Sequence, residues 1–275
     1  MVLQRIGAAH PRVRNLRSVA RNLGLAPARD GHPVEYTVVE AVWAHEMLLD
    51  TGTPIVDFFW CPEASHSERV HACARRVCEV ARHAYRMSPG VLQRLSGRRR
   101  SDGLLSLVRL PDWNPEGWTF GGSALVLVAD GIEYAGNLGA LIRIADASGA
   151  TCLIMTNRRI RRSHREVFGA SRGTVLTMPI LQFPDVDEAA AWLDEHNFEV
   201  VVADPNAERC YRERSYGFGR TAVVVGSEGR GASAVWCARG STAICIPMLG
   251  VADSLNVAAS AAIVLYEVRA RKAGW

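Results

Sequence analysis

Short apolar runs alternate with amphipathic segments through the second half of the chain. Runs such as 124–129 and 221–225 hold almost no polar residues, which is typical of strands buried on both faces of a parallel sheet. The predicted strands are 124–129, 151–155, 199–203, 221–225 and 243–246, and the predicted helices are 138–147, 187–196 and 254–271. Because strands alternating with helices form a mostly parallel sheet covered on both faces, residues 123–275 are predicted to be an α/β domain.

The first 112 residues show a less regular pattern. The predicted helices are 37–49 and 67–85, and the predicted strands are 54–60 and 103–110. The second of these helices is predicted from apolar residues at helical spacing, namely Val70, Ala74, Val77, Cys78 and Ala81. The stretch 111–122 contains two prolines and three glycines, which punctuate regular structure. We therefore predict a small α/β domain over 1–112 and a linker over 113–122.

The charge is distributed unevenly between these two regions. The chain has 275 residues, a length that fits about two domains, and a formal net charge of +4. Residues 1–122 carry 16 arginines against 12 acidic residues, whereas residues 123–275 carry 16 basic and 16 acidic residues. Clustered arginines attract polyanions, so the front region is a candidate for RNA or DNA binding. A solvated, arginine-rich surface explains the same charge equally well.

Several classes of protein fit this sequence poorly. No apolar run reaches the ~18 residues that cross a bilayer, and the first five residues lack the apolar core of a signal peptide. The seven cysteines are widely scattered, which favours reduced thiols and a cytoplasmic protein. Cys61, His66, His71 and Cys73 lie near one another, but their spacing matches no usual zinc motif. We therefore expect neither a membrane segment nor a metal.

The loops that follow the predicted strands hold the candidate chemistry, because ligands of parallel sheets bind at the carboxyl ends of the strands. After 124–129 comes Gly136-Asn137-Leu-Gly139, where Asn137 is a candidate helix N-cap. Arg143 would project from the second turn of that helix. It either faces a ligand or forms a buried salt bridge to Asp146 or Glu228.

Two further loops that follow predicted strands also hold candidate site residues. Residues 226–231 read Gly-Ser-Glu-Gly-Arg-Gly, in which three glycines let the backbone approach a ligand closely. This is neither a phosphate-binding loop nor a dinucleotide fingerprint, and a simple turn remains open. Residues 246–256 lead into a helix rich in small residues, with Ser254 as a candidate N-cap. Asn256 is either a site residue or merely the start of the helix.

Taken together, these three loops resemble the signature motifs of the SpoU (TrmH-like) family of RNA ribose 2′-O-methyltransferases, within the SPOUT superfamily. The matching phrases lie at 136–143, 226–231 and 246–258, and the resemblance covers 123–275. It implies a C-terminal domain with a trefoil knot, an exception to the usual absence of knots. It also implies S-adenosylmethionine as cofactor, a homodimer packed through the knot region, and a small α/β RNA-binding domain at 1–112. The opening Pro11-Arg12-Val13-Arg14-Asn15-Leu16 fits such a front domain.

The resemblance assigns roles residue by residue. The implied catalytic residues are Arg143, Asn137, Glu228, Ser254 and Asn256. The implied cofactor-binding residues are Val225, Gly226, Ser227, Glu228, Gly229, Gly231, Ile246, Met248, Ser254, Leu255 and Asn256. The candidate RNA-binding residues are Arg12, Arg14, Arg17, Arg98, Arg99, Arg100 and Arg172. Family members are proposed to use the arginine matching Arg143 near the 2′-hydroxyl, either as a base or as an electrostatic stabiliser.

Two shorter phrases bear on the RNA target. Residues 130–132 and 170–173, the latter followed by Met178-Pro179, are similar to the thiostrepton- and nosiheptide-resistance enzymes that methylate an adenosine ribose in large-subunit ribosomal RNA. This favours 23S rRNA over tRNA as substrate, in a housekeeping or an antibiotic-resistance role. The alternatives are a tRNA ribose 2′-O-methyltransferase and an RNA-binding paralogue that methylates nothing.

Overall fold

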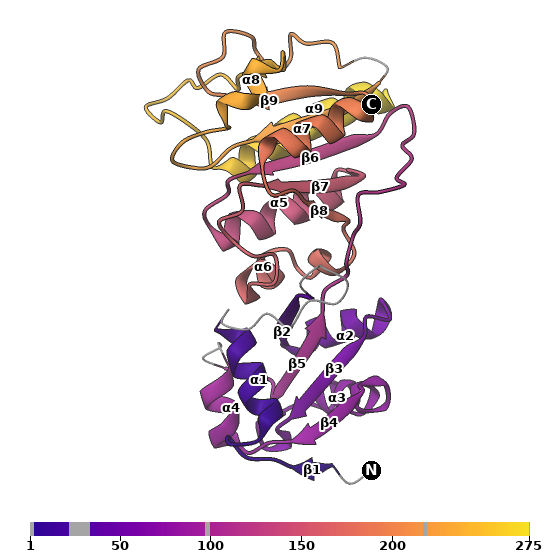
Figure 1. Ribbon diagram of the computed structural model, residues 1–275. Coiled ribbons are helices and arrows are strands. Elements are labelled where there is room, and N and C mark those ends of the chain that lie inside the picture. The colour runs from indigo at the N-terminus through magenta and orange to yellow at the C-terminus, as the bar shows by residue number, and fades with distance from the viewer. Residues whose placement is uncertain (1–2, 22–33, 97–99, 217–218, 275) are drawn as a thin grey trace. The chain divides into compact units, whose positions relative to one another are not determined.

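Two β-sheets, one in each half of the chain, organise the protein (Figure 1). The computed structural model describes residues 3–21, 34–96, 100–216 and 219–274. Contacts divide the chain into a first unit, Met1–Asp112 together with Ser163–Phe168, and a second unit, Trp113–Arg162 together with Gly169–Trp275. A short segment from the middle of the chain therefore belongs to the first unit.

The first unit is built on a mixed five-stranded sheet in the order β1-β4-β3-β5-β2. Its strands are β1 (Gln4–Arg5), β2 (Tyr36–Glu40), β3 (Ile55–Trp60), β4 (His83–Arg86) and β5 (Leu104–Arg109). Its helices are α1 (Pro11–Ala20), α2 (Val42–Asp50), α3 (Glu68–Val80) and α4 (Pro89–Leu95), with a 3-10 turn at Pro62–Ala64. Helices α1 and α4 share one hydrophobic cluster with alternate strand residues, and α2 packs against α3. The unit is thus an α/β layer structure, as its sequence indicated.

Two predicted helices of this unit are too long. The expected helix 37–49 begins as strand β2, because Thr37, Val38 and Val39 are β-branched and pair with β5 in an antiparallel ladder. Only the residues from Val42 onward are helical. The expected helix 67–85 ends at Val80, and the chain then forms β4, which pairs with β3 in parallel.

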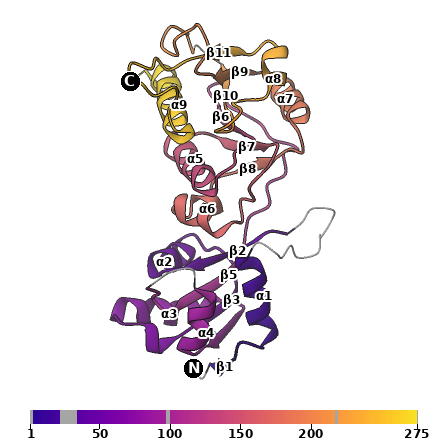
Figure 2. The same ribbon diagram turned by 90° about the vertical axis from the view of Figure 1, so that its left-hand side faces the viewer.

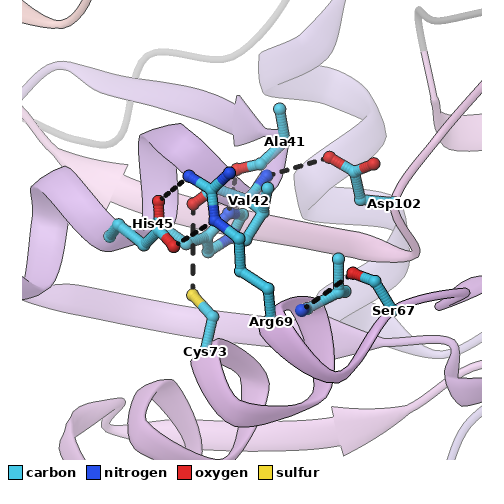
Figure 3. A network of polar contacts seen from close by, with 9 residues as sticks. Ala41, Val42, His45, Ser67, Arg69, Cys73 and Asp102 are labelled. Carbon is cyan, nitrogen blue, oxygen red and sulfur yellow. Dashed lines mark hydrogen bonds and ion pairs between the residues drawn. The ribbon is translucent and has the colours of Figure 1, made fainter.

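The junction between β2 and α2 is held by polar groups that are buried or half-buried (Figure 3). Ala41 sits there with φ 78°, a conformation that costs energy in any residue but glycine. The Asp102 carboxylate accepts the Val42 N–H at 2.9 Å and so caps α2 from outside the helix. His45 lies between the Ala41 carbonyl, 2.8 Å from Nδ1, and the Ser106 hydroxyl, 2.9 Å from Nε2. Burial lowers the pKa of His45 to about 4, so this histidine is neutral and structural.

The second unit contains a six-stranded sheet in the order β11-β9-β10-β6-β7-β8, and every strand pair in it is parallel. The strands are β6 (Leu125–Asp130), β7 (Cys152–Thr156), β8 (Ile180–Gln182), β9 (Phe198–Ala203), β10 (Arg220–Val225) and β11 (Thr242–Ile244). The predicted parallel sheet is therefore confirmed. Strand β8 has only three residues, and the hydrophobic pattern alone did not reveal it.

Helices cover both faces of this sheet (Figure 2). Helices α5 (Ala135–Ala147) and α9 (Val257–Ala273) pack together on one face, whereas α7 (Val186–Glu195) and α8 (Ala234–Ala238) pack on the other. A short helix α6 (Arg165–Ala170) and a 3-10 turn (Thr174–Leu176) follow β7. Because all six strands run in parallel, their carboxyl ends lie along one edge of the sheet, which is where the candidate site forms.

Candidate functional site

A pocket of about 770 Å³ lies where strands β9, β10 and β11 end. Its walls come from four stretches of chain: the start of α5, the residues after β9, the loop after β10, and the segment between β11 and α9. Parallel strands deliver these stretches to one edge, although they are far apart in the sequence. Its polar lining includes Asn137, Glu228 and Asn256, one residue from each of the three motifs.

The two ends of the loop after β10, residues 226–231, are hydrogen-bonded to each other. The backbone of Ser227 exchanges two hydrogen bonds with that of Gly231, at 3.0 and 2.9 Å, and the Ser227 hydroxyl accepts the Arg230 N–H at 3.2 Å. A Cβ on Gly226 would lie 1.9 Å from the Ala232 nitrogen, so only glycine fits at the base of the loop. The loop is therefore a tight, preformed structure rather than a simple turn.

A chain of side-chain hydrogen bonds joins the three motifs at this pocket. The Asn137 amide donates to Glu228 Oε1 at 2.5 Å, and the Glu133 N–H donates to Glu228 Oε2 at 3.2 Å. Asn137 Oδ1 in turn accepts the Asn256 amide at 3.1 Å. The side-chain oxygen of Asn256 accepts the Ala258 N–H at 2.9 Å, so Asn256 also caps α9. The three loops that the sequence marked are thus tied to one another directly.

Two predicted helix caps are wrong. Helix α5 begins at Ala135 with Tyr134 as its cap, so Asn137 lies inside the first turn and its side chain is left for Glu228. Helix α9 begins at Val257, and its N-cap is Asn256 rather than Ser254. The Ser254 hydroxyl instead donates to the Asp253 carboxylate at 3.2 Å, on an exposed part of the pocket wall.

Arg143 stands apart from this chain of bonds. It is exposed on α5 and does not line the pocket. Within the described residues its guanidinium forms no hydrogen bond and no ion pair, so the buried salt bridge to Asp146 or Glu228 is not present. Arg143 therefore carries an uncompensated positive charge on the helix that also bears Asn137.

The structure brings the predicted cofactor residues together. All of them line the pocket: Val225, Gly226, Ser227, Glu228, Gly229, Gly231, Ile246, Met248, Ser254, Leu255 and Asn256. Sequence reasoning missed the wall that follows β9, formed by residues 203–206, although a loop directly after an apolar strand was a usable signal. It also missed Tyr134, whose ring is 62% exposed where it lines the pocket.

The candidate RNA-binding arginines are in different situations. Arg12 pairs with the buried carboxylate of Asp57 at 3.3 Å, so part of its charge is compensated inside the first unit. Burial raises the pKa of Asp57, whereas Arg12 acts to lower it. Arg14 is exposed on α1, and Arg17 is half-buried on the same helix.

Arg100 and Arg172, the other described arginines of this set, lie outside the helices and strands. Arg100 lines a second cavity of about 520 Å³ in the first unit. Arg98 and Arg99 lie outside the described residues. Arg172 is exposed in the second unit, in the turn after α6, with φ 53°.

Exposed apolar side chains gather on the segment between β11 and α9. Leu249 and Val251 are almost fully exposed, at 98% and 105%, and Leu255 is exposed at 38%. Exposed apolar side chains that follow one another along a segment are candidates for an interaction surface. Among residues 3–21, 34–96, 100–216 and 219–274, no helix is long and apolar enough to cross a membrane, and no three His, Cys, Asp or Glu side chains are grouped as metal ligands.

Comparison with known proteins places this geometry in context. The model of the SpoU rRNA methylase family matches residues 124–266. A protein of Staphylococcus haemolyticus (strain JCSC1435) assigned to the TrmH family of tRNA/rRNA methyltransferases is 33% identical over 147 residues, which cover 54% of this chain and 59% of that protein. The chain thus spans about three-fifths of the length of the curated relatives that it matches.

Solved structures match over nearly the whole chain. The crystal structure of an RNA 2′-O ribose methyltransferase has a TM-score of 0.77 at 31% identity, covering 97% of this chain and 98% of its own. An AdoMet-bound rRNA methyltransferase from Sinorhizobium meliloti has a TM-score of 0.81 at 22% identity, covering 97% of each chain, which is a likeness of fold alone. The predicted α/β fold class with its mostly parallel sheet is confirmed.

Proposed function

This chain belongs to the SpoU rRNA methylase family, and from that premise we propose that it transfers a methyl group from S-adenosylmethionine to a ribose 2′-hydroxyl of structured RNA. The observation that carries the proposal is the chain of hydrogen bonds from Glu228 through Asn137 to Asn256. It joins three motifs, far apart in sequence, at one pocket at the carboxyl edge of a parallel sheet.

The size and the lining of the pocket suit S-adenosylmethionine. Its volume of about 770 Å³ lies within the ~300–1,000 Å³ that is usual for small-molecule sites. Apolar side chains such as Val202 and Ile246 suit an adenine ring, and the carboxylates of Asp204 and Glu228 suit the positively charged sulfonium and ammonium groups. The closed loop 226–231 offers backbone groups that are already fixed in place, which lowers the entropic cost of binding.

The residues of this chain then have three separate tasks. When bound, the cofactor supplies a methyl group on a positively charged sulfur, already activated for transfer. The pocket wall holds that group still, while Asn137, Glu228 and Asn256 keep the three loops in register. Ser254 lies on the same wall, where its hydroxyl can contact cofactor or substrate. Fixing both reactants in this way is the main contribution a protein makes to such a transfer.

Arg143 would act on the RNA. Arginine side chains remain protonated in proteins, so a role as general base is chemically unfavourable. We assign it instead to the phosphate and the 2′-hydroxyl of the target nucleotide, where a fixed positive charge stabilises the oxyanion that develops during transfer. Its exposure and its lack of an ion pair within the described part of the chain support this assignment, because the charge is available to a ligand.

Ribosomal RNA, and 23S rRNA in particular, is the substrate that we propose. The family model that matches residues 124–266 is that of the SpoU rRNA methylases, and the first unit carries the excess of arginine. Arg14 and Arg100 are exposed there, where they can contact phosphates. Such contacts hold an RNA in position, while the chemistry takes place in the second unit.

A homodimer is the assembly that we propose, packed through the region expected to form the knot. Leu249, Val251 and Leu255 expose apolar surface beside the pocket. Tyr134 is exposed at the N-cap of α5 and Tyr266 on α9, and these two helices pack together. A second copy of this region would remove that surface from water. Sedimentation of the wild-type protein and of Val251→Asp would test this, with a dimer expected for the first and a monomer for the second. A monomeric wild type would contradict it.

The experiment for the whole proposal is a transfer assay with methyl-labelled S-adenosylmethionine. Purified protein would be incubated separately with 23S rRNA and with bulk tRNA, and cofactor affinity would be measured by calorimetry. We expect micromolar binding of the cofactor and label in the 23S rRNA. Label in tRNA alone would overturn the choice of substrate. Absent or millimolar cofactor binding would favour an RNA-binding paralogue without activity.

A further inference from the structure

The carboxylate of Asp130, at the carboxyl end of β6, lies behind the pocket wall. The residue is 2% exposed and accepts four hydrogen bonds. Oδ1 accepts from the Thr156 hydroxyl at 3.0 Å and the Asn157 amide at 2.8 Å. Oδ2 accepts from the Ser233 backbone N–H at 2.8 Å and the Trp236 indole N–H at 3.1 Å. Buried charges of this kind persist only when donors satisfy them fully.

The two oxygens of Asp130 serve different segments. Oδ1 holds the end of β7, the neighbouring strand in the sheet. Oδ2 holds the segment that follows the loop 226–231 at its point of entry into α8. A further bond at 3.1 Å, from the Asn157 amide to the Ser233 hydroxyl, fixes the same point a second time. One side chain therefore ties the sheet to the exit of the pocket loop.

The loop is thereby held at two places. Its tip is held by the bonds of Glu228 to Asn137 and to the Glu133 N–H, and its exit is held by the bond between Asp130 and the Ser233 N–H. We propose that Asp130 is a positioning residue for the cofactor, which acts by holding the loop 226–231 in its binding geometry through the segment that follows it. The inference rests on the proposed function, since it assigns that loop to S-adenosylmethionine.

An ionised carboxylate suits this position because it is acceptor-only, with two oxygens for four donors. In Asp130→Asn the side chain keeps its shape, but its amide nitrogen would face two donors and leave them unsatisfied. Removing the partner of a buried donor costs more than the bond itself contributes. Because loops generally open more readily than the central strands of a sheet, we expect the misfit to fall on Ser233 and the loop.

The experiment compares Asp130→Asn with the wild-type full-length protein. Cofactor affinity would be measured by calorimetry, and amide hydrogen exchange of residues 227–233 would be measured without cofactor. We expect at least a ten-fold weaker affinity, faster exchange in the loop, and a KM for the cofactor that rises far more than the KM for RNA. Unchanged affinity with a lowered melting temperature would overturn the proposal and leave Asp130 a purely structural residue.

Further variants test the two carboxylate oxygens of Asp130 separately. They keep the proposal testable if Asp130→Asn fails to fold. Trp236→Phe removes one Oδ2 donor and keeps an aromatic ring, so we expect affinity to fall three- to five-fold. Thr156→Val removes one Oδ1 donor at nearly constant volume, so stability should fall while affinity stays within two-fold. Asp57→Asn alters a buried carboxylate of the first unit and should leave affinity unchanged. Equal losses of affinity in Thr156→Val and Trp236→Phe would contradict the proposal.

The failure of this inference can be told apart from failure of the proposed function. A wild type that does not bind S-adenosylmethionine would refute the function. Hydrogen exchange of the loop in the free protein would still decide whether Asp130 holds it. If the wild type binds and Asp130→Asn binds equally well with an equally protected loop, the function stands and the positioning role is refuted.

Discussion

Two strand-to-helix junctions, one in each unit, are held by side-chain polar groups in opposite ways. Between β2 and α2, His45 and Ser106 are fully buried, and the half-buried carboxylate of Asp102 caps the helix. Figure 3 shows His45 and Asp102 at this junction. Between β6 and α5 the corresponding bonds, from Glu228 to Asn137 and on to Asn256, lie at the surface of a cavity.

This difference separates stability from function. Buried hydrogen bonds contribute to the free energy of unfolding, because a broken pair leaves a desolvated group behind. Exposed bonds contribute little to that free energy, because water replaces them readily. The junction at β6 therefore shapes a pocket at little gain in stability, whereas the junction at β2 stabilises a closed core.

The largest effect should come from Arg143, which takes part in neither junction's bonds. Arg143→Ala should lower methyl transfer by at least about 100-fold, the usual loss when one oxyanion-stabilising group is removed. Calorimetry should show unchanged cofactor affinity and denaturation an unchanged melting temperature. Arg271→Ala, at the end of α9, is the control and should transfer at the wild-type rate. Near-normal turnover in Arg143→Ala would exclude its proposed role.

The buried junction should make the first unit sensitive to acid. The neutral form of His45 is favoured in the fold, so its stabilisation is complete above pH ~6.5 and is lost as the pH falls towards 4. The loss should reach about 2 kcal/mol at pH 5, measured by urea unfolding followed by a probe in this unit. His45→Gln, which cannot titrate, should show a flatter pH profile. Identical profiles for the two proteins would contradict the assignment.

A substitution at the exposed junction should weaken cofactor binding and leave the stability of the fold nearly unchanged. Glu228→Gln keeps the size of the side chain but replaces one carboxylate oxygen by an NH₂ group. The new side chain therefore cannot accept hydrogen bonds at both ends, from the Glu133 N–H and from the Asn137 amide. We expect about a ten-fold weaker affinity for S-adenosylmethionine, in line with the worth of a hydrogen bond to a charged group, and a melting temperature shifted by less than about 2 °C. A large loss of stability without loss of affinity would reverse the comparison between the junctions.

The smallest effect should come from single arginines of the front unit. Arg14→Gln removes one exposed charge on α1 and should weaken RNA binding about three-fold while reducing the slope of affinity against salt by about one. Cofactor affinity should stay constant. Arg12→Gln offers a contrast, since Arg12 already pairs with Asp57 and its loss should lower stability. If RNA affinity is unchanged in Arg14→Gln, helix α1 is not part of the RNA-binding surface.

Much of the site could be predicted because its residues have distinctive local chemistry. Glycines beside Asn137 and Glu228, in the stretches that follow two apolar strands, indicated backbone that approaches a ligand. The predicted cap of α9 was wrong because Ser254 and Asn256 are both good caps, and only the bond from the Ala258 N–H to the Asn256 side chain distinguishes them.

Other features carried no local signal. Strand β2 was missed because it runs into α2 with only Ala41 between them, and no glycine or proline marks the turn. The role of Asp130 could not be predicted, since its partners Ser233 and Trp236 are about a hundred residues away and meet it only through the sheet.

The most direct measurement is the position of the methyl group on the product. RNA methylated by the purified protein would be hydrolysed with alkali and analysed by mass spectrometry, because a 2′-O-methyl group protects the adjoining phosphodiester from cleavage. The account predicts one alkali-resistant dinucleotide from 23S rRNA with the wild type and none with Arg143→Ala. A methyl group on a base, or no transfer by a protein that binds S-adenosylmethionine tightly, would contradict it.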